Sequence, residues 1–154
     1  MGICALLDDE RGSVTSRFGD DMQLDDIREM LQAKIASRIY YPDLPIHAVI
    51  AADLMSDVLS FSRGEDTLLL TGLINPQTVR TAEVAAMAAI VFVRGKVPPE
   101  DTVRLAEQSG LPLLATSFTM FEACGRLYAA GLRGSEITPA EEQAPGGVPI
   151  GSAE

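Results

Sequence analysis

The sequence predicts an α/β fold, a three-layer sandwich in which helices cover a mostly parallel sheet. Two observations predict it. Four apolar runs of strand length are continuous rather than alternating, which is typical of strands covered on both faces. Helix signals separate these runs, and the alternation indicates βα units joined by right-handed crossovers. The four runs are Ile46–Ala52, Thr67–Thr71, Ala89–Val93 and Leu111–Ala115.

The composition divides the chain into three parts. Its 154 residues suffice for one domain of ordinary size. The regular alternation lies within residues 22–132, which we predict to be that domain. Residues 1–21 form an N-terminal extension with one short apolar start. Residues 133–154 are acidic and rich in proline and glycine, so they bury too little apolar surface to offset the entropy of ordering. We therefore predict a disordered tail.

The domain is predicted to begin with an amphipathic helix over residues 23–35. Apolar residues recur there at helical spacing, which indicates one buried face. Those residues are Leu24, Ile27, Leu31 and Ile35. Residues 38–41 follow as a short β-type run, which ends at Pro42 because proline interrupts a strand.

The helices after the later strands carry terminal signals. Asn75 can cap a helix in which Pro76 takes the first position, where a missing N–H costs nothing. Glu100 stands in the first turn of the next helix, and Gly110 closes that helix. Ser117 or Thr119 can cap the last helix, where Thr119 and Glu122 could form a capping box. The predicted buried stripe of the last helix is Phe121, Cys124, Leu127 and Tyr128.

Composition argues against several classes of protein. The formal charge is −10 and no stripe of Lys and Arg is present, so we predict no nucleic-acid partner. No apolar run is long enough to span a bilayer, and no secretory signal is evident, so we predict a cytoplasmic protein without a membrane partner. Two cysteines and one histidine are too few for a usual metal site, and we predict no metal and no cofactor.

Polar residues follow each of the four predicted strands. Ligands bind open parallel sheets at the carboxyl ends of the strands, where loops and helix N-termini converge. A phosphate or carboxylate could rest there with arginine or lysine as counter-charge. The alternative is that these residues only cap helices, form turns and solvate loops. The candidate ligand-binding residues are Asp53, Ser56, Thr71, Gly72, Asn75, Arg94, Gly95, Lys96, Thr116 and Ser117.

Catalytic patterns are weak, and we predict that the chain is not an enzyme. It has no P-loop, so a kinase assignment would be unsupported, and no Gly-x-Ser-x-Gly elbow. Asp53 and Asp57 could form an acid/base or cation-binding pair, but acidic residues at a helix start are the more common interpretation. His47 lies within a strand pattern, where a packed or edge histidine is more common than a general base.

The strand ends resemble those of the DRTGG domain, a family named for Asp, Arg, Thr, Gly and Gly at two strand ends. Asp53, Thr71 and Gly72 match, whereas Leu54 stands in place of the arginine and Leu73 in place of the second glycine. Similar domains precede the kinase part of HPr kinase/phosphorylase, and also occur in long phosphate acetyltransferases and beside CBS domains. The segments that carry the resemblance are residues 51–58, 68–73, 91–96 and 112–117.

The resemblance implies regulation rather than catalysis. It predicts a non-catalytic regulatory or sensory domain that forms a homodimer and binds a small anionic metabolite or nucleotide at the strand ends. The alternative is an adaptor subunit of a redox assembly, such as one containing a hydrogenase, or of a phosphotransfer assembly. Leu54 and Leu73 favour this alternative, because apolar side chains at the rim suit a protein partner.

Overall fold

The computed structural model describes residues 22–61 and 65–135, and nearly all of the predicted domain lies within them. The predicted extension, residues 1–21, and residues 136–154 of the predicted tail lie outside the described residues. The described strands are β1 (Lys34–Ile35), β2 (Ala48–Ala51), β3 (Thr67–Thr71), β4 (Ala89–Phe92), β5 (Leu113–Ala115) and β6 (Arg133–Gly134). The described helices are α2 (Leu24–Met30), α3 (Met55–Phe61), α4 (Pro76–Val84), α5 (Glu100–Gln108) and α6 (Met120–Ala129).

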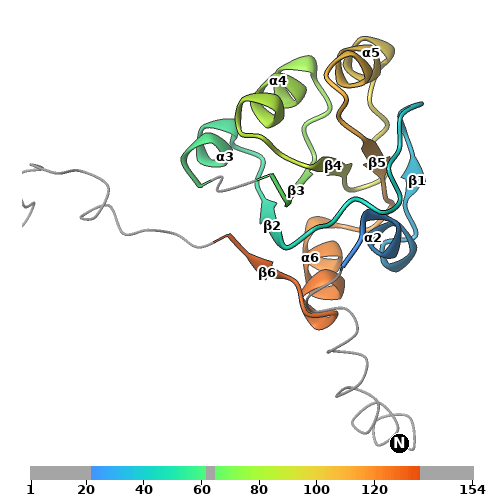
Figure 1. The fold of residues 1–154 in the computed structure, drawn as a ribbon, viewed down its shortest axis with the longest axis vertical. Helices are drawn as coiled ribbons and strands as arrows, with labels where there is room; N and C mark the ends of the chain where they lie inside the picture. The colour runs from blue at the N-terminus through green and yellow to red at the C-terminus, as the bar shows by residue number, and fades with distance from the viewer. Residues whose placement is uncertain (1–21, 62–64, 136–154) are drawn as a thin grey trace, which may run out of the picture.

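These strands form one sheet in the order β1-β5-β4-β3-β2-β6, as predicted a mostly parallel one (Figure 1). Only β1 runs antiparallel, against β5. From β2 to β5 each strand is added on the same side of the last, so right-handed crossovers place α3, α4 and α5 on one face. The chain then returns across the sheet to β6, which places α6 on the opposite face beside α2. The fold is therefore the predicted three-layer α/β sandwich.

Two hydrophobic cores lie on the two faces of the sheet. The first packs α2 and α6 against alternate residues of the strands, such as Leu68, Leu70 and Val91. The second packs α3, α4 and α5 against the intervening residues, such as Leu69 and Ile90. All residues of β3 and β4 are buried. The continuous apolar runs thus arise from burial on both faces, as expected of a central parallel sheet.

The predicted helix over residues 23–35 is too long. Helix α2 ends at Met30, and Gln32 then takes a left-handed φ of 49° that turns the chain into β1. The side-chain hydroxyl of Thr116 donates to the carbonyl oxygen of Leu31 at 2.6 Å, which ties this helix end to the end of β5. Ile35 consequently lies in an edge strand and is 46% exposed rather than buried.

Two further predictions around the sheet edges are wrong. Residues 38–41 form no strand, because the hydroxyl of Ser37 accepts from Leu113 N–H at 2.9 Å and donates to the Ile39 carbonyl at 2.7 Å. The Ser37 side chain thereby takes the place of the next backbone hydrogen bond between β1 and β5, and the pairing of β1 ends there. At the other edge, β6 pairs with β2 beyond the predicted domain boundary at residue 132.

The predicted helix starts are confirmed, but the predicted stripe of α6 is only half right, because Leu127 is buried and Cys124 partly buried while its two aromatic residues are not. Asn75 accepts from Thr78 N–H at 3.0 Å, and Thr119 accepts from Glu122 N–H at 3.2 Å. On α6, however, Phe121 is 86% exposed and Tyr128 is 60% exposed. The buried side of the helix is centred on Ala123 and Leu127 and is rotated away from these aromatic residues. No helix in the described part of the chain is long and apolar enough to cross a bilayer.

Candidate functional site

Eight of the ten predicted site residues fall into two separate clusters at the carboxyl ends of the strands. The first, which we call the latch, consists of Asp53, Thr71, Gly72 and Arg94, after β2, β3 and β4. The second lines a hollow between the ends of β4 and β5. The residues of this hollow are Gln32, Lys34, Gly95, Lys96, Val97, Ala115, Thr116 and Ser117.

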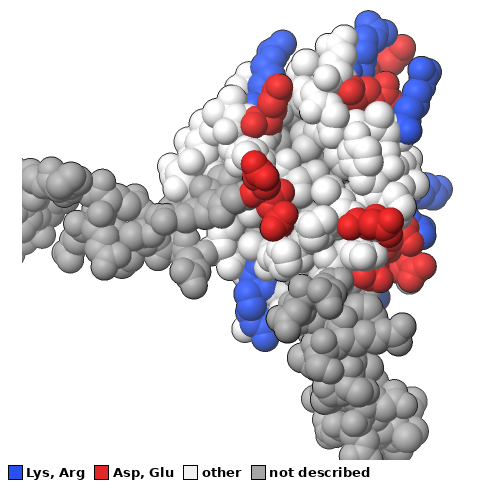
Figure 2. Space-filling view, in the orientation of Figure 1, with Lys and Arg blue, Asp and Glu red and all other residues white. Residues whose placement is uncertain are grey.

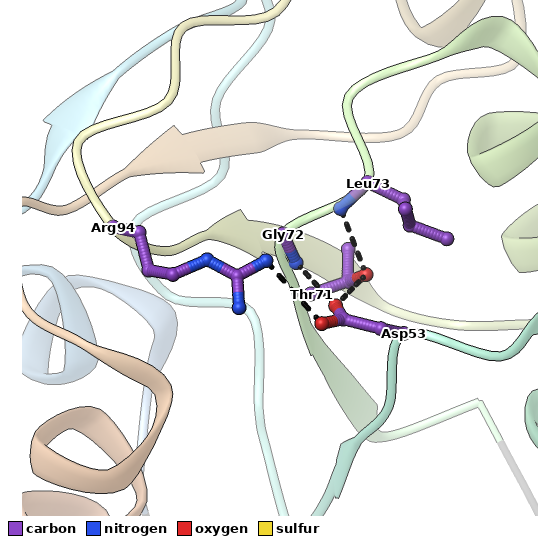
Figure 3. A network of polar contacts seen from close by, with 5 residues as sticks. All are labelled: Asp53, Thr71, Gly72, Leu73 and Arg94. Carbon is purple, nitrogen blue, oxygen red and sulfur yellow. Dashed lines mark hydrogen bonds and ion pairs between the residues drawn. The ribbon is translucent and has the colours of Figure 1, made fainter.

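The latch is a network of hydrogen bonds centred on the carboxylate of Asp53 (Figure 3). Oxygen Oδ1 accepts from Gly72 N–H at 2.7 Å and from the Thr71 hydroxyl at 3.2 Å. Oxygen Oδ2 accepts from Nη2 of Arg94 at 3.3 Å. The Thr71 hydroxyl in turn accepts from Leu73 N–H at 3.2 Å. The carboxylate therefore joins the ends of three neighbouring strands.

These donors stabilise the charged form of the Asp53 carboxylate. The hydrogen bond from Gly72 N–H makes the largest contribution to a lowered pKa of Asp53, and partial burial opposes it. The Thr71 hydroxyl and the Arg94 guanidinium lower the pKa further. Asp53 is thus held as a carboxylate with its hydrogen-bonding capacity largely used within the protein. That arrangement suits a structural clasp better than a general base.

Arg94 lies so close to Gly72 that no side chain would fit between them. A Cβ built on Gly72 would overlap the guanidinium of Arg94. Arg94 itself has a left-handed φ of 63°, and its N–H donates to the Phe118 carbonyl at 2.8 Å. The neighbouring Gly95 N–H donates to the Thr116 carbonyl at 3.0 Å. The loop after β4 is therefore tied to both the latch and the loop after β5.

The hollow has a volume of about 310 Å³ and contains both lysines of the 154-residue chain. Lys34 on β1 and Lys96 after β4 are both exposed, and neither forms an ion pair within the described residues. The hydroxyl of Ser117 likewise has no hydrogen-bond partner there. The hollow thus offers two cations and a hydroxyl that the described part of the protein does not use.

The hollow lies at the point in the sheet where successive connecting helices lie on opposite faces. The loop after β4 leads to α5 on one face, whereas the loop after the neighbouring β5 leads to α6 on the other (Figure 1). At such a switch point the two loops diverge and leave a crevice, which is where open α/β sheets bind their ligands. The latch, by contrast, lies between strands whose helices all stay on the same face.

Three of the predicted ligand-binding residues have structural roles, which the sequence analysis gave as the alternative interpretation. Asn75 caps α4, and Ser56 lies in the first turn of α3, in neither cluster. Thr116 is buried and its hydroxyl is bonded to the Leu31 carbonyl, although its residue borders the hollow. Gln32 and Lys34 were missed because the sequence analysis predicted a helix over residues 23–35, whereas these two residues follow the end of α2. The sequence signal that could have pointed to Lys34 is that the chain has only two lysines.

The residues of the weak catalytic hypothesis lie apart. His47 precedes β2 and contacts Asp66 with 3.0 Å between Nδ1 and Oδ2, whereas Asp53 follows the opposite end of the same strand. Asp57 borders a different hollow, beside the edge of β2. No group of metal-ligating side chains occurs within residues 22–61 and 65–135. On the face shown in Figure 2, basic side chains lie in separate places with acidic side chains among them.

Comparison with known proteins supports the fold. No protein-family model matches the chain, and no curated protein matches it. A similar solved structure is that of the CBS and DRTGG domains in the regulatory region of a Clostridium perfringens pyrophosphatase, complexed with its activator diadenosine tetraphosphate. The TM-score is 0.59 at 16% identity, over 71% of this chain and 47% of that one. The chain therefore has a DRTGG-like fold and spans about half of its structural neighbour.

Proposed function

We propose that this chain is a regulatory module that binds a small phosphate-bearing or carboxylate-bearing metabolite in the hollow between β4 and β5. One observation carries the proposal. Both lysines of the chain, 62 positions apart in the sequence, flank one hollow at the topological switch point, and the described residues offer neither of them an ion pair. In a chain of net charge −10, a local pair of unneutralised cations favours an anionic ligand.

The chemistry of the hollow suits a terminal phosphate or carboxylate. Lysine binds phosphate as a compact point charge with three rotatable donors, so two lysines can approach one anion from different sides. The Ser117 hydroxyl adds a donor without charge. Arg94 was the other cation expected to serve this purpose, but its guanidinium is engaged with Asp53 in the latch.

The size of the hollow limits the ligand. Small-molecule pockets usually measure about 300–1,000 Å³, and this hollow, at about 310 Å³, is at the lower end. We therefore infer that it holds one anionic group and a small attached portion, and that any base or second phosphate of a nucleotide extends outside. The neighbour's complex with a phosphate-rich nucleotide supports the ligand class, and its regulatory rather than catalytic role supports a non-enzymatic function.

Selective labelling of the two lysines gives a direct test. Reductive methylation with ¹³C-formaldehyde keeps the lysine charge and yields NMR signals only from Lys34, Lys96 and the α-amino group. We expect inorganic phosphate, pyrophosphate or ATP to shift both lysine signals along one saturation curve. Lys96→Ala should weaken binding about tenfold or more, as loss of a charged contact does. Arg80→Ala removes an exposed arginine of α4 outside the hollow and serves as the matched control.

The experiment can contradict the proposal in two ways. If saturating phosphate, pyrophosphate, ATP and acetyl phosphate leave both signals unmoved, the hollow is not an anion site. If Lys34→Ala and Arg80→Ala weaken binding equally, the effect reflects the overall charge of the protein and not this site.

The adaptor alternative stays a prediction. Leu54, which stands in place of the family arginine, is 59% exposed at the end of β2. An apolar side chain in that position favours a protein contact at the latch side of the rim. Stoichiometric co-purification of an enzyme that is lost on Leu54→Asp would support it over the regulatory function.

A further inference from the structure

Helix α6 presents an outer face on which no other helix of the described residues packs, and its one side-chain ring contact there is Arg133, which stacks on the Tyr128 ring at 3.9 Å. Phe121 and Tyr128 are 86% and 60% exposed, and they are seven residues apart, which places them on the same side of the helix two turns from each other. Between them lie Cys124, which is partly buried, and Gly125, where an added Cβ would meet nothing within 4 Å. The face therefore consists of two aromatic projections separated by a shallow notch of small residues.

The apolar surface continues from this face onto the sheet. A hollow of about 260 Å³ lies between α6 and the edge of β2, and its lining is mostly apolar, with Arg133 as the charged residue in it. Cys124 and Tyr128 form part of its wall on the helix side, and Val49 and Ala51 form part of it on the β2 side. The helix lies on the opposite face of the sheet from α3, α4 and α5, so none of these helices covers it (Figure 1).

We propose that the outer face of α6 is a dimer interface that pairs antiparallel with the same helix of a second copy. The spacing of the face is self-complementary. A two-fold axis between positions 124 and 125 maps position 121 of one helix onto position 128 of the other. Phe121 of each copy would then meet the second copy's Tyr128, and the notch at Gly125 would let the two backbones approach closely at the axis.

The charges beside the face agree with this pairing. Glu122 and Arg126 lie on one flank of α6, where they form an ion pair of 2.9 Å within the helix. Because a two-fold axis perpendicular to the helices keeps each flank on its own side, Glu122 of one copy would lie within one helical residue of Arg126 in the second. The antiparallel pair therefore places opposite charges together on both sides of the axis, whereas a parallel two-fold pair would put the charged flanks of the two copies on opposite sides, where they do not meet.

Sedimentation equilibrium over a range of protein concentrations tests the proposal. We expect a reversible monomer–dimer equilibrium for the full chain. Phe121→Ala should raise the dimer dissociation constant by about tenfold or more, because aromatic residues at the centre of an interface carry much of its binding energy. Val84→Ala is the matched control, since Val84 is also strongly exposed (79%) but lies on α4. It should leave the dissociation constant unchanged.

A charge swap and a cross-link define the geometry. Glu122→Arg alone should weaken the dimer, and Glu122→Arg combined with Arg126→Glu should restore it. In a Cys4→Ser background, a short bis-maleimide should join two chains through Cys124, because the two-fold axis passes about 0.8 Å from that position along the helix.

Three outcomes would overturn this interface. The first is a protein that stays monomeric at every concentration. This outcome includes the case in which another segment of the same chain covers α6. The second is a dimer that Phe121→Ala does not weaken, which would lie on another surface. The third is a dimer that forms normally but yields no cross-link through Cys124.

Discussion

The two clusters at the strand ends differ in how their polar groups are used. In the latch, each oxygen of the Asp53 carboxylate accepts from donors of this chain, and the cation Arg94 is paired. In the hollow, Lys34 and Lys96 have no ion pair within the described residues. The latch also contains the residues that resemble a family motif, whereas the hollow is identified only by its position in the sheet.

The difference indicates which cluster stabilises the fold and which is available to a ligand. A buried polar group that loses its partner destabilises a protein, so the latch should contribute to folding. Exposed, unpaired cations contribute little to folding and keep their charge for an anion. Substitutions in the two clusters should therefore have opposite signatures, with a change in stability for the latch and a change in ligand affinity for the hollow.

The largest effect on stability is expected from Asp53→Ala. This change leaves the fully buried Thr71 hydroxyl and the Gly72 N–H without their acceptor. We expect the free energy of unfolding to fall by about 1–3 kcal/mol, the cost of leaving such groups unsatisfied. Urea denaturation measures it. Asp57→Ala, at the start of the adjacent α3, is the control, and an equal loss in both variants would contradict a special role for the latch.

The same carboxylate should make stability depend on pH. Because the pKa of Asp53 is lower in the folded chain than in the unfolded one, its contribution is complete above the unfolded value of about 3.9 and is lost as the pH falls through the folded value. The stability difference between the wild type and Asp53→Asn should therefore shrink on acidification. A difference that is constant between neutral pH and about pH 3 would exclude Asp53 as the titrating group.

Thr71→Val should have a smaller effect. Valine keeps the shape of threonine but removes the hydroxyl that accepts from Leu73 N–H and donates to Asp53. We expect a loss of about 1 kcal/mol in the free energy of unfolding. Thr67→Val at the other end of β3 is the matched control, because Thr67 is also buried but its hydroxyl has no side-chain hydrogen bond among those described. A loss of equal size at Thr67 would assign the effect to the strand and not to the latch.

Gly72→Ala should lower the free energy of unfolding by less than Thr71→Val does, and only because it displaces the side chain of Arg94. The added methyl group displaces the end of a flexible side chain and breaks its ion pair with Asp53, in which both partners are over 40% exposed. Such pairs contribute less than about 1 kcal/mol. In an Arg94→Ala background the same substitution should have almost no effect. A cost that persists there would indicate a backbone cause.

The sequence predicted the sheet well and the site only in part. Strand β3 matches its apolar run residue for residue, because burial on both faces removes polar residues from a central strand. The edge elements were less predictable, since β1 and β6 have only two residues each and depend on contacts with distant segments. Lys34 was missed for this reason. The exposed aromatic residues of α6 followed helical spacing, but spacing alone does not distinguish a core from an interface.

The smallest effect on stability is expected from the double substitution Lys34→Ala and Lys96→Ala. Both side chains are exposed and unpaired in the described structure, so the free energy of unfolding should change by no more than about 0.5 kcal/mol. A ligand that binds only the folded state stabilises it by an amount that grows with the ratio of ligand concentration to dissociation constant, so phosphate or ATP should raise the melting temperature of the wild type and of Thr71→Val alike. It should not raise that of the double variant. If the double variant responds as the wild type does while Thr71→Val does not, the roles of the two clusters are the reverse of those assigned.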